Sequence, residues 1–325
     1  MLDKNILDQV KGVFASLKSQ ITFAATSKKD DEKKRELQEF LNDIASTSEK
    51  LSVSFTEEEN AQLSFKLLKD NNETGITFRG IPNGHEFTSL LLAVLNTDGQ
   101  GKNFPDEAIQ RRIKSLKGEI ALKTYVSLTC TNCPDVVQAL NLMSLINPNI
   151  KHEMVDGGIY QQEVSDLNIQ GVPAVYCNNE SLHIGRGDLG ILLQELEDMV
   201  GSEALENEET IEREYDVIVV GGGPAGASAA IYSARKGLKV GLVAERIGGQ
   251  VNDTTGIQNL ISVPNTNGTQ LAADLKAHLS DYPIELFEHR KIASVSLKEK
   301  IKSIKVKGGE VFKAPAVIIA TGANW

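Results

Sequence analysis

Residues 129–134 read TCTNCP, which places Cys130 and Cys133 three positions apart with two residues between them. Residues 120–128 before them are rich in apolar and β-branched side chains and predict a strand, and the run to about Leu145 predicts a helix. A helix N-terminus stabilises a thiolate through its unpaired N–H groups and its dipole. We therefore predict that Cys130 attacks a disulfide, and that Cys133, one turn into the helix, resolves the mixed disulfide.

Two other roles are open for cysteines at this spacing. They could fill a core, or they could bind a metal together with a partner chain. A closed zinc site needs four ligands, and none of the five histidines has a paired spacing near the cysteines. Cys177 lies in a short apolar strand and is expected to be an inert buried thiol.

The residues that follow the helix complete a small α/β pattern. We expect a strand at 151–155, a helix at 160–167, a hairpin at 175–177 and 182–184, and a closing helix at 189–199. This order resembles thioredoxin. By that resemblance, Pro173 should be in the cis form, face the cysteines and offer backbone to an extended partner segment.

The first hundred residues repeat this order more weakly. Strands are expected at 21–25, 51–55, 63–68 and 76–78, and helices at 30–44 and 86–95, after an amphipathic helix in the first twenty residues. This segment contains no cysteine. We predict a degenerate thioredoxin-like fold at residues 1–100 and a redox-active copy at 101–200.

An acidic stretch follows the second copy. Between Glu195 and Glu214 there are nine acidic residues and one basic residue, with few large apolar side chains after Val200. Such a composition is typical of a solvated linker or an exposed helix. We assign residues 201–213 as a linker about which the flanking modules can move.

A nucleotide-binding pattern begins after this linker. A buried strand at 215–220 leads into GGGPAG at 221–226 and a helical run at 227–236. GxGxxG alone is weak, and a chance glycine-rich turn is the alternative, but the strand and helix around it favour a dinucleotide site. Gly221 would make the tight turn, Gly223 would let the backbone approach the pyrophosphate, and Gly226 would allow close packing of helix on strand. Glu245, nineteen residues beyond Gly226, can bind ribose hydroxyls.

The fingerprint itself leaves FAD and NAD open. Beyond Glu245 come Gly248, Gly249 and Gln250, then Asn259, and finally an expected strand at 316–320 that runs into Thr321 and Gly322. This arrangement resembles flavoprotein disulfide reductases of the thioredoxin reductase type. The residues that we expect to contact FAD beyond the three glycines and Glu245 are Pro224, Ala225, Gly249, Gln250, Asn259, Thr321 and Gly322. The predicted fold class is α/β, with two tandem thioredoxin-like folds followed by an incomplete Rossmann-type FAD-binding domain at 214–325.

The whole chain resembles one family, the F subunit of alkyl hydroperoxide reductase. The resemblance is most specific at residues 84–90, 127–143 and 230–237. It implies a homodimeric, FAD-containing reductase that takes electrons from NADH and reduces the disulfide of a peroxiredoxin, the subunit that destroys hydroperoxides. It further implies that Cys130 is the interchange thiol and that Glu86 lies near the dithiol and assists proton transfer. The alternative for Glu86 is a carboxylate that merely favours a helix N-terminus.

The sequence departs from this family in one respect. Family members continue into an NADH-binding domain with a second CxxC, and the sequence stops at Trp325. We therefore expect an incomplete member with an intact dithiol module that does not oxidise NADH by itself. The alternative is a non-catalytic piece that docks on a peroxiredoxin or on full-length subunits.

Charge and composition limit the partners. The net charge of −10 and pI near 5.2 argue against a nucleic-acid binder, because no basic stripe could neutralise a run of phosphates. No apolar stretch approaches the length of a membrane span, and the first residues lack the pattern of a signal peptide. We expect a cytoplasmic protein.

Overall fold

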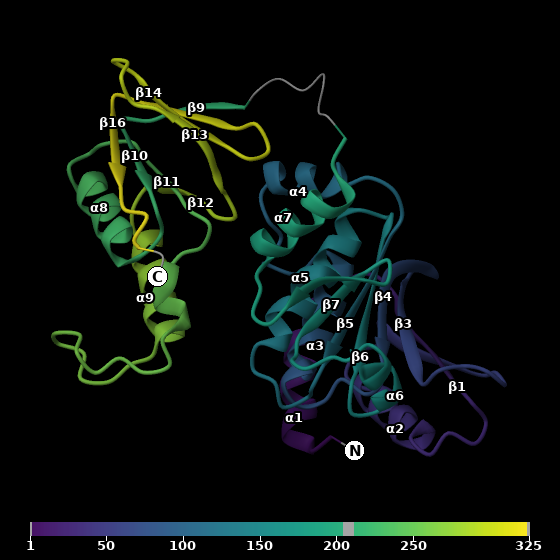
Figure 1. Ribbon diagram of the computed structural model, residues 1–325. Coiled ribbons are helices and arrows are strands. Elements are labelled where there is room, and N and C mark those ends of the chain that lie inside the picture. The colour runs from purple at the N-terminus through teal and green to yellow at the C-terminus, as the bar shows by residue number, and fades with distance from the viewer. Residues whose placement is uncertain (1, 204–210, 324–325) are drawn as a thin grey trace. The chain divides into compact units, whose positions relative to one another are not determined.

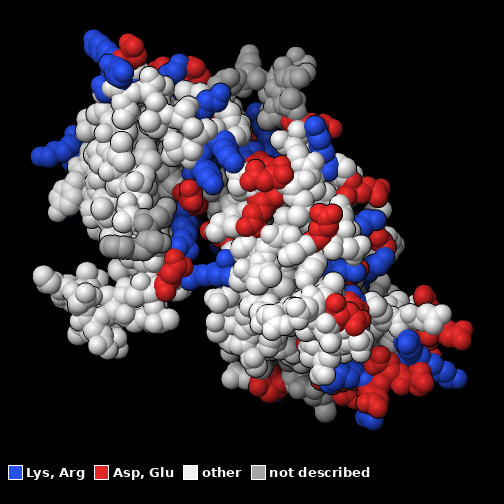
Figure 2. All heavy atoms as spheres, in the orientation of Figure 1, with Lys and Arg blue, Asp and Glu red and all other residues white. Residues whose placement is uncertain are grey.

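The computed structural model describes residues 2–203 and 211–323, which belong to two compact units divided after Ala204 (Figure 1). No described helix is both long and apolar enough to cross a bilayer. Figure 2 shows basic and acidic side chains interspersed over the visible face of each unit, with blue atoms in small groups.

The first unit is built on a single eight-stranded sheet, in the order β2-β1-β3-β4-β6-β5-β7-β8. The strands are β1 Ile21–Ser27, β2 Leu51–Glu57, β3 Ser64–Lys69, β4 Asn72–Arg79, β5 Ile120–Val126, β6 Ile150–Asp156, β7 Ala174–Cys177 and β8 Glu180–Ile184. The halves meet where β4 runs parallel to β6, from Ile76 beside His152 to Arg79 beside Val155. The two predicted thioredoxin-like folds are thus joined edge to edge.

Helices cover this sheet. They are α1 Lys4–Phe14, α2 Lys34–Ala45, α3 Phe87–Asp98, α4 Glu107–Lys114, α5 Cys133–Ile146, α6 Gln161–Asp166 and α7 Leu189–Val200, with a 3₁₀ turn η1 Gly84–Glu86 before α3. The sequence pattern did not predict α4. Its start is fixed by Asp106, whose side chain accepts hydrogen bonds from Ala108 N and Ile109 N. Its buried side packs Ile109 and Ile113 into the core beside α5 and α7.

α5 connects the two cores of this unit. It is apolar nearly all round, which is typical of a helix buried on several sides. Cys133 and Val137 belong to the core formed with β1, α2 and α3, whereas Leu140 and Met143 belong to the core formed with α4 and α7. The dithiol helix is therefore held by both halves of the unit.

The second unit contains a four-stranded parallel sheet, β12-β11-β10-β16, and a smaller sheet, β13-β14-β15-β9. The strands are β9 Glu212–Glu214, β10 Val217–Val220, β11 Val240–Val243, β12 Ile284–Phe287, β13 Ile292–Ser296, β14 Lys302–Val306, β15 Val311–Ala314 and β16 Ala316–Ile319. The helices are α8 Pro224–Arg235, η2 Gly249–Asp253 and α9 Gly268–Ser280. The parallel sheet with α8 on it is the predicted Rossmann-type pattern.

Two local predictions need correction here. α8 begins at Pro224 and not at Ala227, because proline needs no N–H donor in the first turn of a helix. In the acidic stretch, Glu212–Glu214 forms β9, which pairs with Val311–Lys313 and is tied to it by an ion pair between Lys313 and Glu212. Residues 204–210 of the predicted linker lie outside the described residues.

Candidate functional site

Cys130 and Cys133 form a disulfide with their Cα atoms 5.6 Å apart. Cys133 is fully buried in the core, whereas Cys130 is partly exposed. A partner disulfide can therefore reach the sulfur of Cys130 but not that of Cys133. This difference in access matches the predicted roles of attacking and resolving thiol.

The start of α5 places both sulfurs at a helix N-terminus. Cys133 is the first helical residue, not one turn inside the helix as predicted, and Asn132 at the cap position makes no side-chain capping bond. Pro134 occupies the first turn, where its missing N–H costs nothing. The free N–H groups and the helix dipole consequently face the dithiol, where they favour a thiolate.

Pro173 lies beside the dithiol. The Val172–Pro173 peptide bond is cis, as predicted, and Cys130 Sγ lies 3.7 Å from Val172 O. The carbonyl oxygen of Pro173 accepts a hydrogen bond of 2.8 Å from Gly185 N, just after β8. The loop is thus anchored to β8 while it remains in contact with Cys130.

Glu86 ends the η1 turn, which lies against the loop that precedes the dithiol, since His85 N donates to Leu128 O at 3.0 Å. The side chain is 0 % exposed, and neither carboxyl oxygen has a hydrogen-bond partner. Burial raises the pKa of Glu86 to about 7, the nearby Ser89 hydroxyl opposes this rise, and the negative charge of Asp135 adds to it.

Glu86 also stands at the N-terminus of α3, where a carboxylate is favoured by the helix dipole. Glu86 is the cap residue of α3, but its side chain accepts no hydrogen bond from the helix backbone. The role of Glu86, whether in proton transfer or as a carboxylate favoured by the helix dipole, stays a prediction.

A second buried polar group, on β6, contacts α5 and was not predicted. His152 on β6 is fully buried, with Nε2 2.7 Å from Thr124 Oγ1 and Nδ1 2.7 Å from Asn141 Oδ1. Desolvation lowers the pKa of His152 to about 3, so the ring is neutral. With Nδ1 donating to Asn141 and Nε2 accepting from Thr124, this network ties α5 to the sheet.

An ion pair fixes the seam between the halves. Arg79, at the end of β4, is 3 % exposed and pairs with Glu163 of α6, and its guanidinium lies 4.2 Å from the ring centre of Tyr160. Tyr125 donates to Glu163 Oε2 at 3.0 Å. The hydrogen bonds from Arg79 lower the pKa of Glu163, which keeps this carboxylate charged. Sequence patterns did not indicate this cluster, because its halves come from segments far apart in the chain.

In the second unit, the three fingerprint glycines surround the N-terminus of α8. Gly221 has φ +114°, and a Cβ there would overlap Ala320 O; a Cβ at Gly226 would overlap Gly221 O. A Cβ at Gly223 would meet only Gly248 O at 3.9 Å, so this backbone is open to a ligand. Gly223 caps α8 without a side-chain bond, and Pro224 and Ala225 form its first turn. An uncapped helix N-terminus with open backbone suits a pyrophosphate.

Most of the other residues predicted to contact FAD gather at this edge. Gly249 approaches Gly223, and Gln250 donates to the carbonyl oxygen of Ala323, next to Gly322. Thr321 follows β16, and the described residues place its backbone N beside Gly221. Glu245 is exposed just after β11, as the ribose role requires.

Asn259 behaves differently. It lies in the exposed segment between η2 and α9, which is held together by the isolated bridges Ile257 to Thr266 and Leu260 to Val263. No described contact connects this segment's Asn259 with the glycine loop. Its role therefore stays a prediction.

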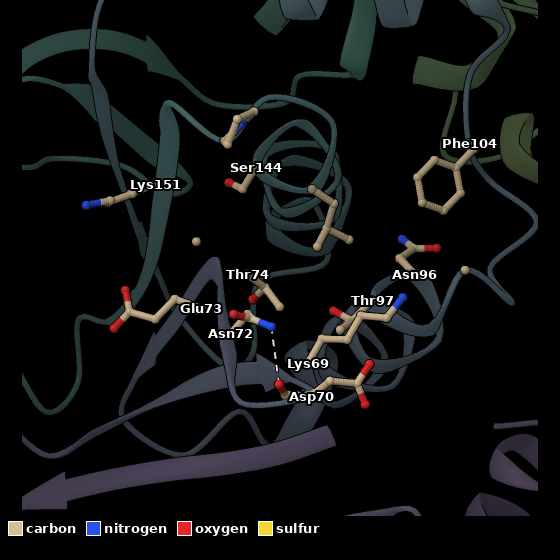
Figure 3. A pocket seen from close by; sticks show the side chains of 14 residues that line it. Lys69, Asp70, Asn72, Glu73, Thr74, Asn96, Thr97, Phe104, Ser144 and Lys151 are labelled. Carbon is tan, nitrogen blue, oxygen red and sulfur yellow. Dashed lines mark hydrogen bonds between the residues drawn. The ribbon is translucent and has the colours of Figure 1, made fainter. Parts of the chain in front are cut away.

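A cavity of about 510 Å³ is lined in part by residues near the C-terminal ends of α3 and α5 (Figure 3). The C-terminus of α3 supplies Asn96 and Thr97, and the C-terminus of α5 supplies Ser144. A helix of twelve residues is about 18 Å long, so this cavity is separate from the dithiol. In the part of the chain that the structure describes, no group of three potential metal ligands occurs.

Comparison with known proteins agrees with this geometry. Residues 215–325 match the family described as pyridine nucleotide-disulphide oxidoreductase. The F subunit of alkyl hydroperoxide reductase from Staphylococcus aureus (strain Mu50) and a protein named NADH dehydrogenase of Bacillus subtilis (strain 168) are each 43 % identical over 325 residues. That alignment covers 100 % of this chain and 62 % of each relative, so the chain spans about three fifths of their length.

A solved structure covers the thioredoxin-like part. The crystal structure of the NTD_N/C domain of alkylhydroperoxide reductase AhpF from Enterococcus faecalis is 32 % identical, with a TM-score of 0.57. The match covers 60 % of this chain and 100 % of that domain. It confirms the predicted fold class of tandem thioredoxin-like folds. Together with the whole-chain identity, it shows that the chain belongs to the family of alkyl hydroperoxide reductase F subunits.

Proposed function

We propose that this chain is a disulfide reductase component that passes electrons through Cys130 and Cys133 to the disulfide of a cytoplasmic peroxiredoxin. The observation that carries the proposal is an accessible Cys130 and a buried Cys133 at the start of α5, with cis-Pro173 beside Cys130. The η1 turn, which ends at the buried Glu86, lies against the loop before the dithiol. In dithiol exchange, an accessible thiolate attacks the partner disulfide and a second thiolate resolves the mixed disulfide.

The reaction proceeds in two exchange steps. The Cys130 thiolate attacks one sulfur of the partner disulfide, forms a mixed disulfide and releases the other partner sulfur as a thiolate. The Cys133 thiolate then attacks Cys130 Sγ, which breaks the mixed disulfide and releases the second partner sulfur. The partner gains two electrons, the Cys130–Cys133 disulfide forms, and the protons of the two cysteines pass to the partner thiolates.

Glu86 serves the proton part of this reaction. With a pKa raised to about 7 by burial, its carboxyl group can both take up and release a proton near neutral pH. Because Cys133 is shielded from water, a nearby protein group would be needed to accept the proton of its thiol. We assign Glu86 this role.

The second unit is proposed to bind FAD. Gly221, Gly223 and Gly226 would let the pyrophosphate approach the N-terminus of α8, and Glu245 would bind ribose hydroxyls. When bound, FAD would supply the electrons that it takes from NADH. Cys130 and Cys133 form the only CxxC of this sequence, whereas the family uses a second one near the flavin.

The proposal is tested with electrons supplied chemically. The chain is reduced with dithiothreitol, desalted and mixed with a disulfide peroxiredoxin, and the peroxiredoxin thiols are counted. We expect one peroxiredoxin disulfide reduced per chain. Cys130→Ser should abolish this reaction, and Cys177→Ser is the matched control because Cys177 is a free, buried thiol. No reduction by the wild-type chain, with stable binding to the peroxiredoxin, would instead support the alternative of a non-catalytic docking piece.

A further inference from the structure

The environment of Glu86 lacks one component that its proposed role requires. Both carboxyl oxygens are buried without a hydrogen-bond partner, although the side chain begins at the N-terminus of α3. A buried carboxylate without any donor is strongly disfavoured and would hold its proton over a wide pH range. A buried carboxyl group that takes up and releases protons therefore needs a hydrogen-bond donor that stabilises its ionised form.

Ser89 is placed to be that donor. It lies in the first turn of α3, three residues after Glu86, and is fully buried. Residues three apart on a helix share a face. Its hydroxyl oxygen accepts a hydrogen bond of 3.4 Å from Nε2 of Gln138. A hydroxyl has one hydrogen and two lone pairs, and an amide nitrogen only donates, so the hydrogen of Ser89 is left for an acceptor.

We propose that Ser89 is a positioning residue for Glu86, and that Gln138 turns the serine hydroxyl so that its hydrogen is donated to the ionised Glu86 carboxylate. The inference rests on the proposed function, because it explains how Glu86 can release a proton inside the core. Gln138 belongs to α5, the helix that begins at Cys133, so the arrangement connects the acid to the dithiol helix.

The charged groups around Glu86 do not supply this donor. Asp135 lies on α5, which packs against α3, and its negative charge favours the protonated form of Glu86. His85, the preceding residue, is exposed. Cys130 and Cys133, in the adjoining loop and helix, become negative when they ionise. Ser89 is thus the neighbour that favours the charged form of Glu86.

The test measures the protonation of Glu86 directly. The infrared C=O band of the protonated carboxyl group is followed against pH in the oxidised full chain, and it is assigned by its loss in Glu86→Gln. Ser89→Ala should raise the titration midpoint by about one pH unit, the size expected for losing a hydrogen bond to a charged group. Gln138→Leu should raise it by less, and Ser89→Thr, which keeps a hydroxyl, should restore it.

Ser144→Ala is the matched control. Ser144 is a buried serine of α5 whose hydroxyl donates to Leu140 O at 3.0 Å, at the far end of the helix from the dithiol. The inference is overturned if the midpoint is unchanged in Ser89→Ala, or if Ser144→Ala moves it equally. Should Ser89→Ala fail to fold, Gln138→Leu decides in the same way. Because the titration uses no peroxiredoxin, a failure of peroxiredoxin reduction with an intact midpoint shift would reject only the proposed function.

Discussion

At the scale of single residues, Glu86 makes the stability of the oxidised protein depend on pH. Its pKa is about 7 in the fold and near 4.5 when exposed, so the folded state binds the extra proton between these values. Stability from this group is therefore present at acidic pH and is lost as pH rises from about 4.5 through 7. As pH rises from 4 to 8, the free energy of unfolding of Glu86→Gln should therefore increase by about 3 kcal/mol relative to that of the wild type. Urea unfolding at a series of pH values checks this.

Asp98 provides a control of opposite sign. Burial alone would raise its pKa, but hydrogen bonds from Ser19 N at 2.6 Å and Lys18 N at 3.0 Å lower it overall. Its stabilisation is thus present above the unfolded pKa and is lost as pH falls through the folded value. Asp98→Asn should consequently lose stability relative to wild type at neutral pH, and the loss should shrink in acid. A gain for Asp98→Asn with rising pH would contradict the interpretation of both carboxyl groups.

Residues that act through local chemistry were predictable from the sequence, whereas residues that act through distant neighbours were not. The spacing of Cys130 and Cys133, the proline before β7 and the glycine fingerprint follow rules that operate within a few residues. Ser89 and Gln138 are 49 residues apart, and Arg79 and Glu163 are 84 apart. No periodicity within either segment records such a contact, so only the fold reveals it.

At the scale of elements, the seam between β4 and β6 depends on the ion pair of the buried Arg79 with Glu163, which is 31 % exposed. Removing Arg79 takes a buried guanidinium out of the seam and leaves Glu163 without its charge partner. Arg79→Ala should therefore lower the free energy of unfolding by about 3 kcal/mol. Lys66→Ala, which removes an exposed pair with Glu73 on neighbouring strands, should change it by less than about 1 kcal/mol. Equal effects in urea unfolding would show that the seam does not rely on this pair.

Another prediction at this scale concerns the turn into α8. A Cβ at Gly226 would overlap the carbonyl oxygen of Gly221, so Gly226→Ala must move α8 away from β10. We expect this variant to lose FAD binding, measured by flavin fluorescence on titration. Gly256→Ala is the control, since a Cβ there meets no atom within 4 Å and the backbone conformation is ordinary. Tight flavin binding by Gly226→Ala would show that the fingerprint turn is not the pyrophosphate site.

The short elements explain where the sequence pattern failed. α4 has eight residues, and β12 to β15 have four or five each, so a period of two or of 3.6 is sampled only once or twice. β13 exposes the apolar Val295, and β14 carries the two lysines Lys302 and Lys305, which weakens any apolar–polar alternation. Long elements such as α5 and β5 were predicted nearly to their ends, because burial imposes their pattern over several turns or pleats.

At the scale of the whole molecule, the order of strands and helices indicated two thioredoxin-like folds, but not that they share one sheet. Strand periodicity shows which face is buried and says nothing about which strand is the neighbour. The parallel pairing of β4 with β6 joins residues 76–79 to 152–155, across a separation of 76 residues. The domain boundaries near residues 100 and 201–213 stay predictions.

The cores of the two units share no residue, and this permits a final prediction. The clusters around α3, α5 and α7 contain residues up to Val200, whereas those of the second unit begin at Tyr215. The end of the first unit is secured by Glu203 N donating to Ser115 O at 2.7 Å, so a chain of residues 1–203 keeps these contacts. Each core can therefore fold on its own. Reduced with dithiothreitol, the 1–203 chain should reduce a disulfide peroxiredoxin within about twofold of the full chain's rate, while Cys130→Ser in the same chain should be inactive. A large loss of rate in a folded 1–203 chain would mean that the second unit contributes directly to dithiol exchange, and that the reductase module is not confined to the shared sheet.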